Sequence, residues 1–109
     1  MNWTILQNMQ QLSGIKSQIG FSIIFKHSTR CPVSMMAKRR VEMDHELIPE
    51  EVQIYFLDLI AYRDVSNSIA EGFNVPHESP QLLLIKDGEC IYETSHGEIS
   101  IEDTLSQIS

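Results

Sequence analysis

Two short apolar runs, residues 21–25 and 81–86, constrain the fold of this 109-residue chain more than any other feature. Their apolar residues do not alternate with polar ones, which is the pattern of strands buried on both faces of a sheet. Helices must then cover both faces. The chain has the length of one domain, so we expect residues 1–109 to fold as a single α/β unit.

The remaining segments alternate between strand and helix patterns. Further strands are predicted over residues 3–6 and 52–59, and helices over residues 8–19, 32–45 and 63–71. Asn8 and Gln11 form a capping-box pattern at the start of the first helix, and Gly72 is expected to end the third. The second helix is expected to bury one apolar face, formed by Val33, Met36, Ala37 and Val41.

A hairpin is predicted near the end of the chain, because Asp87-Gly88 is a strong tight-turn signal between residues 81–86 and 89–94. Ser100 and Asp103 are spaced as a cap for a last helix through Gln107. The order is therefore β-α-β-α-β-α-β-β-α, with right-handed crossovers and an antiparallel final pair. This is the thioredoxin-like arrangement: a mixed sheet of about five strands with helices on both faces.

Cys31 is the residue on which the predicted chemistry depends. It lies directly before Pro32, and proline is favoured at the first position of a helix. The sulfur is therefore expected to meet the free N–H groups of Val33 and Ser34, where the helix dipole favours an anion. Because the thiolate is the form that attacks disulfides, the sequence predicts a redox-active Cys31.

Positive charge gathers around Cys31, although the net charge of the chain is −7. Five of the eight Lys and Arg residues fall within fifteen positions: Lys26, Arg30, Lys38, Arg39 and Arg40. Lys26, His27 and Arg30 are expected to favour the thiolate form of Cys31, whereas residues 38–40 are interpreted as a solvated helix face. The acidic balance elsewhere argues against nucleic-acid binding, and no apolar run is long enough to span a membrane.

Position 34 is a serine, so the chain lacks the second cysteine with which thioredoxins resolve a mixed disulfide. Ser34 is expected to donate a hydrogen bond to the Cys31 thiolate. Cys90 cannot replace a resolving cysteine, because the strand from Pro80 to the hairpin turn would place it roughly 20 Å away, beyond the ~7 Å Cα limit for a disulfide. The sequence predicts a monothiol cycle, completed by an external thiol.

Ser79-Pro80 is the second local signal. A thioredoxin-like fold has a cis-proline beside the active cysteine, directly before the hairpin, and Pro80 fits that place better than Pro76. Ser79 would then offer its backbone to an extended client chain. The four histidines have no metal-ligand spacing with either cysteine, so no zinc site is expected. Met35 and Met36 are interpreted as helix packing, Asp58 as a turn residue, and Cys90 as a small packing residue.

These motifs resemble the YtxJ family of bacillithiol-system proteins over the whole chain. The resemblance is carried by Phe25-Lys26-His27-Ser28, by Thr29-Arg30-Cys31-Pro32, and by Trp3 and Ser79-Pro80. It implies a cytoplasmic monothiol bacilliredoxin of Gram-positive bacteria, which removes bacillithiol from S-bacillithiolated client proteins. Cys31 would be the nucleophile, and free bacillithiol would reduce the resulting mixed disulfide.

Two alternatives stay open at this point. The chain could be a non-catalytic module that binds peptides at the Pro80 loop, or an iron–sulfur carrier of the monothiol-glutaredoxin type. Pro32-Val33 argues against the cluster, because Pro32 provides no N–H and those glutaredoxins have Gly-Phe there. Phe25 and Arg30 stand where thioredoxins have a buried Asp and a Trp, so a dithiol cycle is not expected.

Overall fold

The computed structural model describes residues 3–108 and contains one mixed sheet with helices on both faces. The strands are β1 (Thr4–Ile5), β2 (Phe21–His27), β3 (Gln53–Asp58), β4 (Gln81–Lys86) and β5 (Glu89–Ser95). The helices are α1 (Met9–Ser17), α2 (Pro32–Met43), α3 (Arg63–Gly72) and α4 (Ile101–Leu105), with short 3-10 turns η1 (His45–Leu47) and η2 (His96–Glu98). The predicted thioredoxin-like architecture is confirmed.

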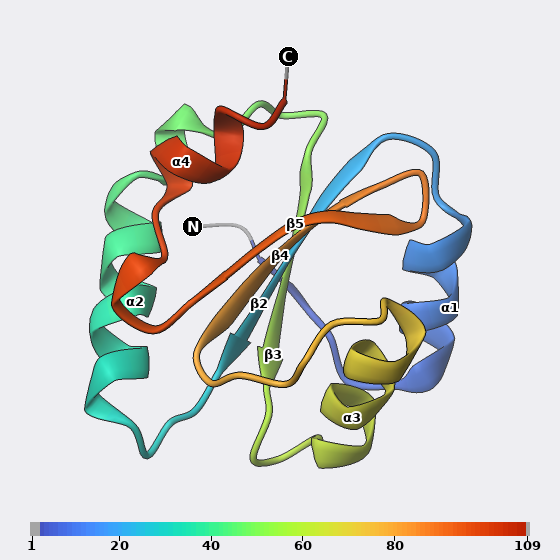
Figure 1. Cartoon of the computed structure of the whole chain (residues 1–109), viewed down its shortest axis with the longest axis horizontal. Helices are drawn as coiled ribbons and strands as arrows, with labels where there is room; N and C mark the ends of the chain where they lie inside the picture. Colours follow the sequence, from blue (N-terminus) through green and yellow to red (C-terminus); the bar gives the residue numbers. More distant parts are fainter. Residues whose placement is uncertain (1–2, 109) are drawn as a thin grey trace.

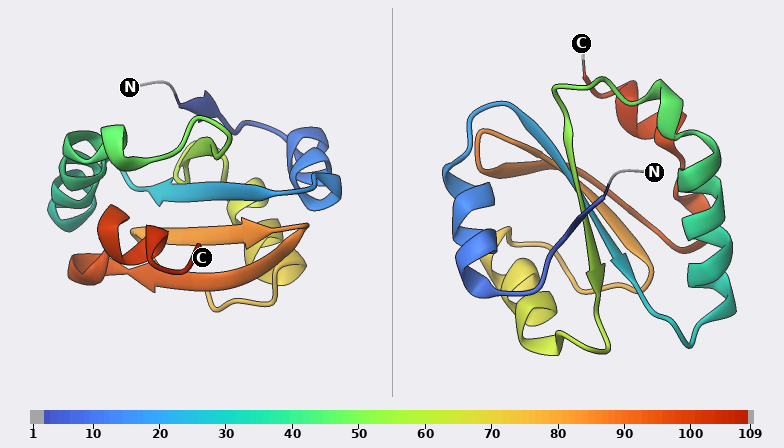
Figure 2. Two further views of the ribbon diagram at one scale, coloured as in Figure 1. Left: turned by 90° about the horizontal axis from the view of Figure 1, so that it is seen from above. Right: turned by 180° about the vertical axis from the view of Figure 1, so that it is seen from behind.

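The strand order is β1-β3-β2-β4-β5, which places β2 at the centre of the sheet (Figures 1 and 2). β1 and β2 run parallel to β3, whereas β4 runs antiparallel to both β2 and β5. The turn between β4 and β5 has positive φ at Asp87 (51°) and Gly88 (82°). Both values suit a two-residue hairpin turn of the mirror-image type, so the predicted hairpin is confirmed.

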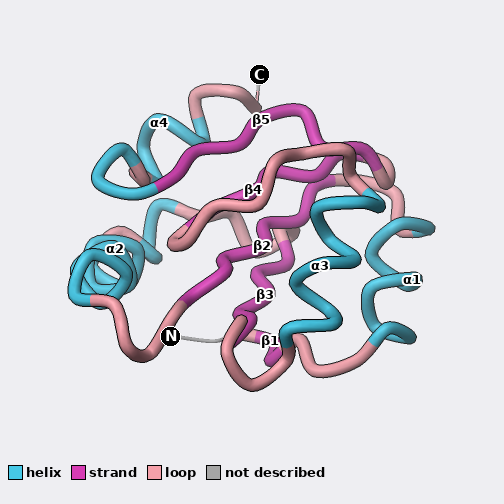
Figure 3. The backbone as a smooth tube through the Cα atoms, turned by 60° about the horizontal axis from the view of Figure 1, so that its bottom comes forward, coloured by secondary structure: helices cyan, strands magenta, loops and turns pink. Residues whose placement is uncertain are grey.

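Two apolar clusters fill the space between the sheet and its helices, one on each face. Successive residues of β2 point to opposite faces, so Ile24 joins the cluster under α1 and α3, and Phe25 joins the cluster under α2 and α4. Figure 3 shows these two helix pairs on opposite sides of the strands. Because β2 is covered on both sides, it is buried almost throughout, as its apolar pattern predicts.

Helix boundaries differ from the predictions where a boundary was predicted from a single residue. The Asn8–Gln11 capping box forms, but α1 ends at Ser17, and Ile19 beyond it is 88% exposed. Gly72 is the last residue of α3, one residue beyond the predicted end, and the left-handed residue after this helix is Asn74, with a φ of 56°. The last helix ends at Leu105 instead of Gln107.

The buried face of α2 also differs from the prediction. Ser34, Ala37 and Val41 are buried, whereas Val33 is 44% and Met36 is 63% exposed. The spacing of apolar residues did not predict this face correctly, because Ser34 occupies one of the buried positions. No helix within residues 3–108 is long and apolar enough to cross a membrane.

Candidate active site at the start of helix α2

Cys31 lies at the N-terminus of α2, as the sequence predicts, but its side chain accepts no capping hydrogen bond, so the expected contact with the N–H groups of Val33 and Ser34 is not formed. It is the N-cap residue, Pro32 is the first helical residue, and the Met35 N–H donates to the Cys31 carbonyl at 3.0 Å. The segment that joins β2 to Cys31 leaves the carboxyl end of the central strand, at the lower end of the sheet in Figure 1. Cys31 is a free cysteine and is half-buried, so the residue is not enclosed in the core.

The Ser34 hydroxyl is engaged on the inner side of the helix. Its Oγ lies 2.7 Å from His27 Nδ1 and accepts the Ser28 N–H at 3.0 Å. The expected hydrogen bond from Ser34 to Cys31 is not among the contacts of the described residues, and Ser34 is fully buried. Ser34 therefore ties the end of β2 to α2. These two contacts hold the start of the segment that leads from β2 to Cys31.

The His27 ring is part of the same inner contact. It stacks 6.0 Å from Phe25 and lies 5.4 Å from Phe56, between β2 and α2. Burial lowers its pKa first, and Lys38 lowers it further, against the opposing effect of Asp58. A neutral ring at pH 7 adds no positive charge near the sulfur, so the sequence-based role of His27 as a cation is not supported.

Replacing Ser34 by alanine should destabilise the fold by about 1–3 kcal/mol, because the Ser28 N–H and the His27 ring lose a buried partner. Urea unfolding would measure the free energy of unfolding. Ser66→Ala is the matched control: Ser66 Oγ is also buried but has no hydrogen-bond partner within residues 3–108. An equal loss of the free energy of unfolding in the two variants would show that the Ser34 hydrogen bonds contribute nothing to stability.

Lys26 lies on the face of the sheet opposite to His27. Its side chain is 0% exposed, and its Nζ lies 2.8 Å from His77 Nδ1 in the loop before Pro80. Burial lowers the pKa of Lys26 to about 8, partly offset by the carboxylate of Glu78. The expected role of Lys26 as a charge that stabilises the thiolate therefore needs correction, because its amine contacts the loop and not the helix N-terminus.

The alkaline pH dependence of stability should contain a contribution from Lys26. Its folded pKa of about 8 is below the unfolded value of 10.5, so the cost of burying its charge is relieved as pH rises above 8. Between about pH 7 and pH 10, the free energy of unfolding of the wild type should rise by about 2–3 kcal/mol relative to Lys26→Met. If the free energy of unfolding of the wild type and of Lys26→Met changed equally with pH, this expectation would be contradicted.

The segment from residue 75 to Pro80, called the proline loop below, leads from α3 into β4. The Ser79–Pro80 peptide bond is cis, as predicted. Lys26 pairs with Gln81 in the antiparallel register of β2 and β4, so the register continued by one residue sets Pro80 opposite His27. The proline loop and the segment to Cys31 thus meet at one end of the sheet (Figure 1).

The basic residues near Cys31 have different surroundings. Arg30 is exposed beside Cys31. Lys38 is partly buried: it pairs with Glu42 at 3.1 Å, and its Nζ lies 5.9 Å from the centre of the Phe56 ring. Arg40 is not a solvated charge, because its guanidinium donates to the carbonyls of Ile99 and His96. It joins α2 to the segment around η2.

A cavity of about 420 Å³ lies along α2 near the site, and its lining includes Thr29, Met35, Met36 and Arg39. The two methionines are exposed, so the prediction that they pack inside the helix interface is wrong. Thr29 and Met35 come from the two segments that flank Cys31 in the sequence. Cys31 itself does not line the cavity, whose lining also includes the cationic side chains of Lys38 and Arg39.

Cys90 lies at the hairpin end of the sheet. It pairs with Ile85 across β4 and β5, packs against the α1/α3 cluster, and its Sγ lies 3.4 Å from the Tyr92 carbonyl. Burial raises the pKa of the Cys90 thiol, which keeps it protonated at neutral pH. These contacts suit the predicted packing role.

Three residues of the site region were not predicted from the sequence: His77, Glu78 and Gln81. All three belong to the proline loop or follow it directly, and they contact one another or Lys26. Their signal in the sequence was a run of polar residues around Pro80, which was interpreted only as a loop. Asp58, by contrast, is confirmed as a turn residue, because its carboxylate accepts the N–H groups of Ile60 and Ala61.

Comparison with known proteins agrees with this geometry. Residues 4–104 match the family model described as monothiol bacilliredoxin BrxC. A candidate oxidoreductase with a thioredoxin fold is 30% identical, with a TM-score of 0.81 over 95% of this chain and 90% of that chain.

Two thioredoxins share the fold at lower identity. The Malassezia sympodialis protein is 15% identical with a TM-score of 0.80, covering 97% of this chain and 90% of its own. Mitochondrial thioredoxin 3 of Saccharomyces cerevisiae is 18% identical with a TM-score of 0.74, and the match covers 97% of this chain and 95% of that chain. A free thiol at a helix N-terminus, a serine three residues later and the match over nearly the whole chain lead to one assignment: this chain belongs to the monothiol bacilliredoxin family and has a thiol oxidoreductase-like role.

Proposed function

We propose that this chain removes bacillithiol, or a similar low-molecular-weight thiol, from mixed disulfides of client proteins through Cys31. The observation that carries the proposal is the free, half-buried Cys31 at the start of α2, with no second cysteine within reach. The only other cysteine, Cys90, is at the hairpin end of the sheet. A single thiol can take over a small thiol from a client, but it needs an external thiol to be regenerated.

The thiol–disulfide exchange proceeds in two steps. The Cys31 thiolate attacks the sulfur of the small thiol in the client mixed disulfide, a new disulfide forms at Cys31, and the client leaves as its free thiolate. A second molecule of the small thiol then attacks the Cys31 disulfide. It leaves as the symmetrical small-molecule disulfide, and Cys31 returns to its thiolate form.

The fold supports this role through the two segments that meet at the site. The proline loop provides the backbone of Ser79 and the face of Pro80, on which an extended client segment would bind. We expect the small thiol, once it is joined to Cys31, to extend toward the exposed Arg30 and the cavity beside α2. The chain would work where thiols are kept reduced, as in the cytoplasm.

The experiment that tests the proposal compares peptides thiolated with bacillithiol, glutathione or coenzyme A. Mass spectrometry should show the small thiol moving from the peptide to Cys31, fastest for bacillithiol, and leaving when free thiol is added. A chain that binds the peptides without any transfer would instead be a peptide-binding module. A coloured protein after anaerobic reconstitution with iron and sulfide would favour the iron–sulfur alternative.

A further inference from the structure

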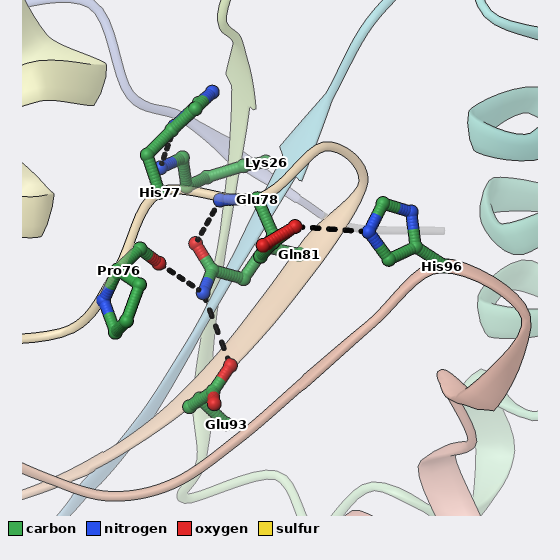
Figure 4. Close-up of polar contacts among 7 residues, drawn as sticks. All are labelled: Lys26, Pro76, His77, Glu78, Gln81, Glu93 and His96. Carbon is green, nitrogen blue, oxygen red and sulfur yellow. Dashed lines mark hydrogen bonds and ion pairs between the residues drawn. The ribbon is translucent and has the colours of Figure 1, made fainter.

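The proline loop is held in place by polar side chains from two adjacent strands. Lys26 on β2 and Gln81 on β4 are direct partners in the sheet, so their side chains project from the same face. The Lys26 amine lies 2.8 Å from His77 Nδ1, and the Gln81 amide donates to the Pro76 carbonyl at 3.0 Å. Figure 4 shows both side chains reaching toward the loop.

The next residue of the loop, Glu78, is held as well. Its N–H donates to the side-chain oxygen of Gln81 at 3.4 Å, and its carboxylate lies 3.0 Å from His96 Nε2 (Figure 4). The Gln81 amide also donates to Glu93 on β5 at 3.1 Å. Three consecutive residues, 76–78, are therefore each tied to the sheet or to the segment after it, immediately before Ser79 and Pro80.

Among these contacts, that of Lys26 is the most unusual. Lysine is almost never fully buried, and an ammonium away from water is costly unless it is well paired. Here the partner is the ring of His77, an exposed loop residue, and not a carboxylate in direct contact. A neutral His77 accepts through Nδ1, and burial together with the charges of Lys26 and Arg63 lowers the pKa of His77. An apolar side chain at position 26 would fill the space at lower cost.

We propose that Lys26 is a positioning residue for client binding. Its buried amine, acting through His77, fixes residues 76–78 and so sets the orientation of Ser79 and Pro80, on which the client chain binds. This inference rests on the proposed function, because it gives Lys26 a role in positioning the client-binding part of that site. It differs from a direct electrostatic role at the sulfur, since Lys26 and the Ser34–His27 contact lie on opposite faces of β2.

The test separates client binding from the reactivity of Cys31. For removal of the small thiol from a thiolated peptide, Lys26→Met should raise KM roughly fivefold to tenfold and leave kcat within about twofold. The pH profile for alkylation of Cys31 by iodoacetamide should match that of the wild type. Lys86→Met is the matched control, because Lys86 is an exposed lysine at the far end of β4 and should not change KM.

His77→Ala provides a second test that leaves the core untouched, so the inference stays falsifiable if Lys26→Met does not fold. It should raise KM as Lys26→Met does. The KM of the double variant should be no higher than that of either single variant, because both substitutions remove the same contact between Lys26 and His77. An unchanged KM in both single variants, with an active wild type, would overturn this inference alone. A shifted alkylation profile with an unchanged KM would also overturn it, and an inactive wild type would overturn the proposed function as well.

Discussion

Replacing Cys31 by serine should abolish removal of the small thiol from a client peptide, with a loss of at least about a thousandfold. A serine hydroxyl at the α2 N-terminus cannot form the disulfide that carries the small thiol, and no other cysteine lies at this end of the sheet. The measurement follows peptide mass and free small thiol over time. The same variant should show no added mass after incubation with the thiolated peptide.

Cys90→Ser is the matched control for this experiment. Cys90 lies at the hairpin end of the sheet, where burial raises the pKa of its thiol, so its removal should leave the rate within about twofold. Full activity in Cys31→Ser would exclude the proposed mechanism. Loss of activity in Cys90→Ser, with the fold intact, would show that the monothiol cycle is incomplete without a second cysteine.

Gly88→Ala should cause the largest loss of stability among small substitutions, about 3–5 kcal/mol. Gly88 has a φ of 82°, which an L-residue rarely adopts. A Cβ at this position would also overlap the backbone carbonyl of Lys16, which belongs to α1 and cannot move aside as a flexible side chain would. Chemical unfolding followed by circular dichroism would measure the free energy of unfolding.

Gly97→Ala is the control for the glycine substitution, because a Cβ there has no neighbour within 4 Å. Its effect should stay within about 0.5 kcal/mol. The difference between the two variants measures the combined cost of the left-handed backbone at Gly88 and of its close approach to α1. The Gly20 N–H, in the segment after α1, also holds this turn by donating to the Asp87 carboxylate at 2.7 Å. A Gly88→Ala protein as stable as the wild type would show that the turn can shift away from α1 at little cost.

The main features of the fold could be predicted from the sequence because their signals are local. The apolar runs of β2 and β4, the Asp87-Gly88 turn and the Asn8–Gln11 capping box each specify the backbone within a few residues. Pro32 after Cys31 marked the start of α2 in the same way. The end of α1 was wrong because Ile19 was counted in the apolar face of the helix, although it lies beyond Ser17 and is exposed.

The order of strands and helices, the position of Cys31 at a helix N-terminus and that of Pro80 before the hairpin can all be derived from local sequence patterns. The contacts of the polar residues around the site depend on how the strands and loops pack together. Ser34 turned inward to His27, and Lys26 became a buried partner of His77, which is 51 positions away in the chain. The physical reason is that partners of buried polar groups are set by which face of a strand each side chain occupies and by which loop then covers it.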